Sequence, residues 1–207
     1  MKLFELKDRV SNHGGIFECT RRRGFTPTPE RKVVHFEHVF EPPVGSAEIP
    51  DVGKLRDFYE TFGSLTLYHD SVSGDAAFHI ARPEAWDDLM ECFRDWMDDV
   101  IDDDPDWLPY WIEDCLAIGE IPQSGNYLLV PLSGNEAGHV FEFEHDGYEF
   151  IELAPDIEAF VLRVLEPDSD MLTDMASHMS FIEGDPMVQW WISTMRDNQG
   201  RFVKSNS

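Results

Sequence analysis

Carboxylates are the side chains of this sequence best placed to do chemistry. Aspartate and glutamate total 41 residues, against 16 lysines and arginines, and they are densest between residues 87 and 106. Such a run can supply acid–base pairs, hold a divalent cation or attract a basic partner. A pair of acids indicates catalysis only where the surroundings separate the two pKa values, which spacing alone does not reveal.

The acidic run also invites a comparison with calcium loops. Asp102, Asp103, Asp104 and Asp106 have a related spacing but lack the glycine of the common twelve-residue loop. A second ligand pair, His35 and Glu37, points to one side of a predicted strand without a third ligand in view. We therefore expect no metal site and no cofactor.

The sequence offers few other groups of residues that could act together in catalysis. His139 and His145 share one face of a predicted strand, but six residues at about 3.3 Å each separate them by roughly 20 Å. Cys115 has no neighbouring histidine to activate it, and phosphate-loop, dinucleotide and nucleophile-elbow motifs are missing. We predict no catalytic residue. A carboxylate-based or metal-assisted hydrolase using the aspartates at 102–106 is the alternative.

The acidic run lies on a predicted helix from Pro83 to about Asp103. Its apolar residues fall at helical spacing and predict one buried stripe: Leu89, Phe93, Trp96, Met97, Val100 and Ile101. Aspartates at the end of a helix oppose its macrodipole, each at a cost of a few tenths of a kcal/mol. Two interpretations stay open: a patch that binds a basic partner, or the solvated face of a very acidic protein.

Residues 117 to 165 carry the clearest strand and turn signals. Asp146-Gly147 lies between two alternating runs and predicts a hairpin with a two-residue type I′ turn. That register places Phe143 opposite Phe150, and Glu144 opposite Glu149. Because two like charges then face each other, either the phenylalanine face is the core face or the loop is longer than two residues. Pro155 and Asp156 then begin a short helix.

Elements on either side complete the expected core. Residues 33 to 40 alternate as a strand, a helix runs from Asp51 to about Phe62, and strands follow at 64–68 and 76–81. We expect three parts: an N-terminal extension with one strand (1–45), a core domain (46–166) and a helical C-terminal extension packed on the core (167–207). The last helix is predicted to begin at Asp185-Pro186. Arg21-Arg22-Arg23 either contacts an anion or pairs with the protein's own acids.

Several short motifs in the core occur in an order that resembles the SUKH superfamily. They are Ile118-Gly119, Ser124-Gly125-Asn126, Gly138-His139-Val140-Phe141, His145-Asp146 and the helix from Ile157 to Phe160. The resemblance covers roughly residues 46 to 166. It implies an α+β fold, a mainly antiparallel β-sheet with helices packed around it. Bacterial members are largely thought to be immunity proteins that neutralise toxins, many of them nucleases, and fungal members act in cell-wall regulation.

The function predicted from these observations is a non-enzymatic protein-binding module, an immunity protein whose acidic surface contacts a basic, nuclease-type toxin. The predicted contact residues are aspartates chosen on charge alone: Asp95, Asp98, Asp99, Asp102, Asp103, Asp104 and Asp106. A regulatory scaffold that binds through Trp190 and Trp191 is a further alternative.

Net charge and composition indicate which further classes of partner, and which cell compartment, to expect. A net charge of −25 disfavours nucleic acid and anionic membranes as partners. Three cysteines without motif spacing suggest reduced thiols, and no apolar run approaches the ~20 residues that a membrane helix needs. With acids in the N-terminal segment where a signal peptide is apolar, we expect a cytoplasmic protein.

Overall fold

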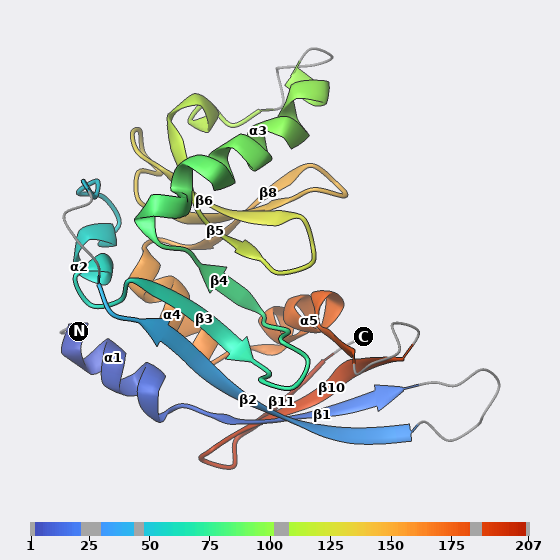
Figure 1. The fold of residues 1–207 in the computed structure, drawn as a ribbon. Coiled ribbons are helices and arrows are strands. Elements are labelled where there is room, and N and C mark those ends of the chain that lie inside the picture. The colour runs from blue at the N-terminus through green and yellow to red at the C-terminus, as the bar shows by residue number, and fades with distance from the viewer. Residues whose placement is uncertain (1–2, 22–29, 44–47, 102–107, 183–187, 206–207) are drawn as a thin grey trace.

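The computed structural model describes residues 3–21, 30–43, 48–101, 108–182 and 188–205. Its strands form one antiparallel sheet of eleven, in the order β11-β10-β1-β2-β3-β4-β5-β6-β7-β8, with β9 paired to β10. Helices pack around this sheet (Figure 1). The expected α+β class with a mainly antiparallel sheet is confirmed.

The strands of the sheet are β1 (Gly15–Arg21), β2 (Glu30–Glu41), β3 (Ser64–His69), β4 (Phe78–Ile80), β5 (Cys115–Ile121), β6 (Asn126–Pro131), β7 (Val140–Glu144), β8 (Glu149–Ala154), β9 (Ser180–Ile182), β10 (Gln189–Asp197) and β11 (Phe202–Lys204). The α-helices are α1 (Leu3–Asn12), α2 (Leu55–Tyr59), α3 (Trp86–Ile101), α4 (Ile157–Leu165) and α5 (Ser169–His178). The helix expected from Asp51 to about Phe62 is therefore shorter than predicted.

Strand β2 connects the two parts of the sheet, β11-β10-β1 on one side and β3 to β8 on the other. It pairs with β1 along its first part and with β3 from Glu37 to Glu41. Val34 and Phe36 are buried, whereas Val33, His35 and Glu37 are exposed, which confirms the alternation predicted from the sequence. The first 45 residues also contain α1 and β1, beside the one strand that was expected there.

The β7–β8 hairpin has the expected register but a different turn. Phe143 pairs with Phe150, and Glu144 with Glu149. The loop has four residues, and its positive φ is at Tyr148 (54°), so the two-residue type I′ turn is wrong and the alternative, a longer loop, is correct. The Glu144 carboxylate accepts hydrogen bonds from the backbone N–H groups of Asp146 and Gly147, which closes the turn through a side chain instead.

The C-terminal region contains a strand where a helix was predicted to follow Asp185. Residues Gln189–Asp197 form β10, which pairs with β1, β9 and β11, and the predicted helix start at residues 185–187 lies outside the described residues. Ile192 and Met195 face the core. Spacings of three and four residues suit a helix, but a bulge opposite Glu18 in β1 lets the same residues face inward from a strand.

Helices cover both faces of the part of the sheet formed by β5 to β8. Helix α3 (green) runs across one side, and α4 and α5 (orange) lie on the other (Figure 1). Side chains beneath α3 form one apolar cluster, separate from the larger cluster that includes residues of α4 and α5. None of the helices in the described ranges combines the length and apolar character required to cross a membrane.

Candidate functional site

Helix α3 is positioned by apolar side chains spaced three and four residues apart. Trp86, Met90, Phe93 and Met97 are buried, and the last three pack in the cluster formed with residues of β5 to β7. Phe93 and Met97 were expected in this stripe. Trp96 was also predicted to lie in this stripe, but 40% of its surface is exposed. It comes one residue before Met97 and therefore lies beside the inward-facing row of side chains.

The outward side of α3 carries a row of exposed acids. Asp87, Asp88, Glu91 and Asp95 are all exposed. Of the seven aspartates predicted to bind a partner, Asp95 therefore lies on this acidic face. Asp98 and Asp99 belong to α3, but their side chains are not described. The remaining four lie outside the described residues: Asp102, Asp103, Asp104 and Asp106.

A shallow hollow of about 540 Å³ lies between α3 and β5. Asp87, Glu91 and Asp95, spaced four residues apart, line its helical side. Its lining also includes Arg94 and, from β5, Cys115 and Leu116. A basic side chain entering this hollow would meet three carboxylates against one guanidinium.

The exposed Trp96 is held in place next to this face. Its ring lies 4.8 Å from the ring of His145, in the β7–β8 loop. His145 is itself fixed, because its Nδ1 lies 2.9 Å from Oδ1 of Asn126 and its backbone N–H donates to the same oxygen. A rigid aromatic ring beside charged groups is the composition typical of an energetically dominant residue in a protein interface.

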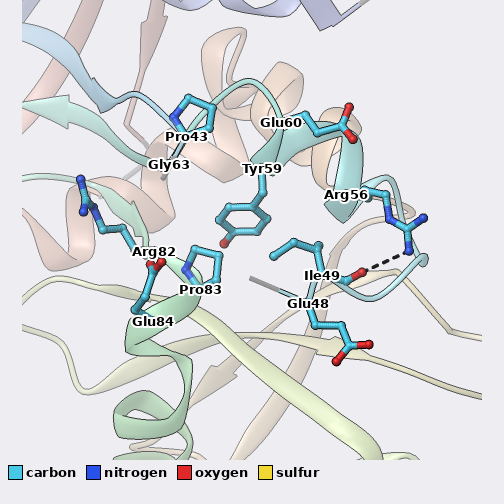
Figure 2. A pocket seen from close by; sticks show the side chains of 10 residues that line it. All are labelled: Pro43, Glu48, Ile49, Arg56, Tyr59, Glu60, Gly63, Arg82, Pro83 and Glu84. Carbon is cyan, nitrogen blue, oxygen red and sulfur yellow. Dashed lines mark hydrogen bonds between the residues drawn. The ribbon is translucent and has the colours of Figure 1, made fainter. Parts of the chain in front are cut away.

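The concave pocket in Figure 2 lies elsewhere, beside α2, and has a volume of about 520 Å³. Several of its polar groups are already engaged. The Tyr59 hydroxyl donates to the Ala81 carbonyl at 2.9 Å, Arg82 forms an ion pair with Glu41, and Arg56 donates to the Ile49 carbonyl. Burial raises the pKa of Tyr59, which keeps this phenol protonated. We assign this pocket no reaction.

Two cysteines are poor nucleophiles. Burial raises the pKa of both the Cys19 and the Cys115 thiols to about 12, so neither forms much thiolate at neutral pH. Cys115 donates a hydrogen bond to the Ile112 carbonyl at 3.2 Å. This geometry disfavours Cys115 as a catalytic residue.

Two groups of described residues bring three metal-ligating atoms within 4.8 Å of one another. One is Glu144, His145 and Asp146, consecutive in the β7–β8 loop. The other is Glu142, Asp174 and His178, from β7 and α5. Neither group was predicted from the sequence, and the only weak signal for the second is an acid and a histidine four residues apart on α5. The pair that was considered, His35 and Glu37, is exposed on β2 and belongs to neither.

The second group has strongly perturbed electrostatics. Burial, followed by the nearby Asp174 carboxylate, raises the pKa of Glu142 to about 7. Burial alone lowers the pKa of His178, but Asp174 and Glu142 outweigh it and raise that pKa. The protonation states of the two carboxylates and the imidazole in this group therefore depend on one another.

Comparison with known proteins gives no family assignment. No protein-family model, no curated protein and no solved structure matches this chain. The likeness to the SUKH superfamily is carried by the sequence motifs, and the function it implies is a proposal.

Proposed function

We propose that this chain is a non-enzymatic protein-binding module, an immunity protein that binds and neutralises a basic, nuclease-type toxin through the outward face of α3. The observation that carries the proposal is the exposed row of Asp87, Glu91 and Asp95 along the hollow between α3 and β5. The choice of a nuclease as the target follows the resemblance to SUKH immunity proteins.

Charge complementarity supports this surface as the contact. A nuclease is basic where it holds phosphates, and a protein with a net charge of −25 attracts such a surface over long distances. Association driven in this way is fast and becomes weaker as salt rises. A module of this kind requires no catalytic group of its own.

Trp96 supplies the apolar anchor that charge alone does not. Exposed acids in water contribute little affinity, whereas a fixed aromatic ring buried on binding contributes much more. Trp96 lies one residue from Asp95, so one partner can cover both. The proposed contact is therefore an aromatic anchor with carboxylates beside it.

The test is capture of partners from the native host by the tagged full-length chain at low salt, followed by a salt wash and a nuclease assay on the captured protein. We expect a basic nuclease that is released as salt rises and is inhibited stoichiometrically by this chain. The triple variant Asp87→Asn, Glu91→Gln, Asp95→Asn should weaken its binding at least tenfold. Trp96→Ala should weaken it by a similar factor.

Two matched variants control for general effects. Glu30→Gln, Glu37→Gln and Asp57→Asn remove the same charge from exposed positions on β2 and α2 and should leave binding nearly unchanged. Trp191→Ala removes an exposed tryptophan on β10, far from α3 along the sheet order. If this control abolishes capture while the α3 variants bind normally, the regulatory scaffold explanation replaces the proposal.

A further inference from the structure

Glu142, Asp174 and His178 converge from two elements on the side of the sheet opposite α3. Asp174 and His178 are four residues apart on α5, so both side chains lie on one face of that helix. Glu142 lies between Phe141 and Phe143 on β7, and strand alternation turns it away from the α3 cluster that those two residues join. The fold thus brings one imidazole and two carboxylates together.

The His178 imidazole lies at ion-pair distance from both carboxylates. His178 Nε2 lies 3.9 Å from Glu142 Oε1 and 3.6 Å from Asp174 Oδ1, both longer than a hydrogen bond. Ligand bonds of about 2.0–2.2 Å place neighbouring donor atoms around one tetrahedral ion roughly 3.3–3.6 Å apart. Small side-chain adjustments would therefore fit all three atoms to one cation.

Burial and hydrogen bonding prepare Glu142 as a ligand. Only 2% of its side chain is exposed, and Asn126 Nδ2 donates to its Oε1 at 2.6 Å. A hydrogen bond of this kind orients metal-ligating carboxylates from outside the coordination shell.

Asp174 gives an independent indication that this group of side chains binds a cation. Its Oδ2 atom is buried and has no hydrogen-bond partner among the described residues. A buried carboxylate oxygen without a donor is costly, and a cation at the centre of the group would compensate for it.

We propose that Glu142, Asp174 and His178 bind one divalent transition-metal ion. One nitrogen and two oxygen donors suit zinc or a neighbouring first-row ion, with remaining positions open to water. His178 and Asp174 are 19% and 33% exposed, which gives the ion access from the α5 side. The bound ion ties α5 to β7. This site lies across the sheet from α3 and does not depend on the proposed toxin contact.

The test uses the full-length chain, stripped with EDTA and dialysed against zinc chloride. We expect about one equivalent of retained zinc by elemental analysis and a higher melting temperature than in EDTA, because an ion that binds only the folded state stabilises it. Cobalt(II) in place of zinc should give the visible absorption of a protein-bound site. Glu142→Gln and His178→Gln should each weaken binding at least tenfold and remove the cobalt signal.

Two histidine variants are matched controls. His145→Gln removes the imidazole of the loop group, and His139→Gln removes the histidine that pairs with Glu152 on β8. Both should retain zinc at the wild-type level. Asp174→Asn, at a partly exposed position, tests the site if Glu142→Gln fails to fold.

Wild-type protein that retains no zinc above background would overturn the proposal, and so would equal retention by His178→Gln. In either case the three residues are a proton-sharing network. Loss of zinc in His145→Gln but not in His178→Gln would move the site to the exposed loop, which also overturns the assignment.

Discussion

Helices α3 and α5 cover opposite faces of the same sheet, and their charged residues lie in different environments. Helix α3 buries Met90, Phe93 and Met97, and the acids along its described outward side are exposed to solvent. Helix α5 buries methionines as well, but its Asp174 and His178 reach the buried Glu142. The direction of the acids decides their chemistry. Outward acids remain hydrated and available to a partner, whereas inward acids must share a proton or a cation.

The largest loss of stability should appear when the inward face of α3 is disrupted. Phe93→Ala removes a fully buried ring that packs against Phe143 at 5.2 Å, and we expect the free energy of unfolding to fall by about 3–5 kcal/mol. Urea denaturation with the wild-type chain as reference measures this loss. A loss below about 1 kcal/mol would show that α3 is not anchored through this face.

Glu142 on the α5 side should make stability depend on pH in metal-free buffer. Its pKa is raised to about 7 in the folded protein, so the folded state holds a proton that the unfolded state releases above about pH 4.5. That stabilisation is lost as pH rises through about 7, by about 1–3 kcal/mol. Urea unfolding at pH 5.5 and pH 8 measures it. Glu142→Gln should flatten this part of the profile, and an unchanged slope would contradict the assignment.

A buried histidine remote from both helices should make stability change with pH in the opposite direction. Burial, followed by the neighbouring His13, lowers the pKa of His38 to about 3, and its Nδ1 accepts a hydrogen bond from the Tyr68 backbone N–H at 3.1 Å. The unfolded chain binds a proton at this residue below about pH 6.5 and the folded chain does not. Stability should therefore fall by about 1–2 kcal/mol as pH drops from 6.5 towards 5.

The variant His38→Asn keeps an acceptor for Tyr68 and lacks the titrating imidazole. Urea unfolding between pH 4 and 6.5 should show a shallower decrease for this variant than for the wild type. An equal decrease would assign the acid sensitivity to other groups.

The smallest effect is expected from the outward acids of α3. Glu91→Gln with Asp95→Asn changes two exposed side chains, and the free energy of unfolding should stay within about 0.5 kcal/mol of the wild type. Circular dichroism during urea unfolding measures it. A larger loss would mean that these acids stabilise the fold, and weaker partner binding by the α3 variants would then have a structural cause.

Local patterns were sufficient for much of the fold. Val34 and Phe36 predicted an inward face of β2, Phe93 and Met97 predicted the buried side of α3, and Phe143 opposite Phe150 predicted the hairpin register. These predictions succeed because alternation and helical periodicity report which side of an element is apolar. The two-residue type I′ turn is not formed because the Glu144 carboxylate accepts hydrogen bonds from two backbone N–H groups in a longer loop. An Asp-Gly pair in the sequence does not reveal such a contact.

Composition and periodicity were enough to predict the α+β class, the acidic character and the position of the acidic helix, because both are local properties of the chain. Packing between distant segments makes residues 189–197 a strand, since pairing with β1 near the opposite end of the sequence outweighs their helical spacing. It also decided that Trp96 is exposed beside His145, and that Glu142 meets two residues of α5 more than thirty positions later. Contacts between distant segments depend on how the sheet and helices pack, and local spacing carries no information about that packing.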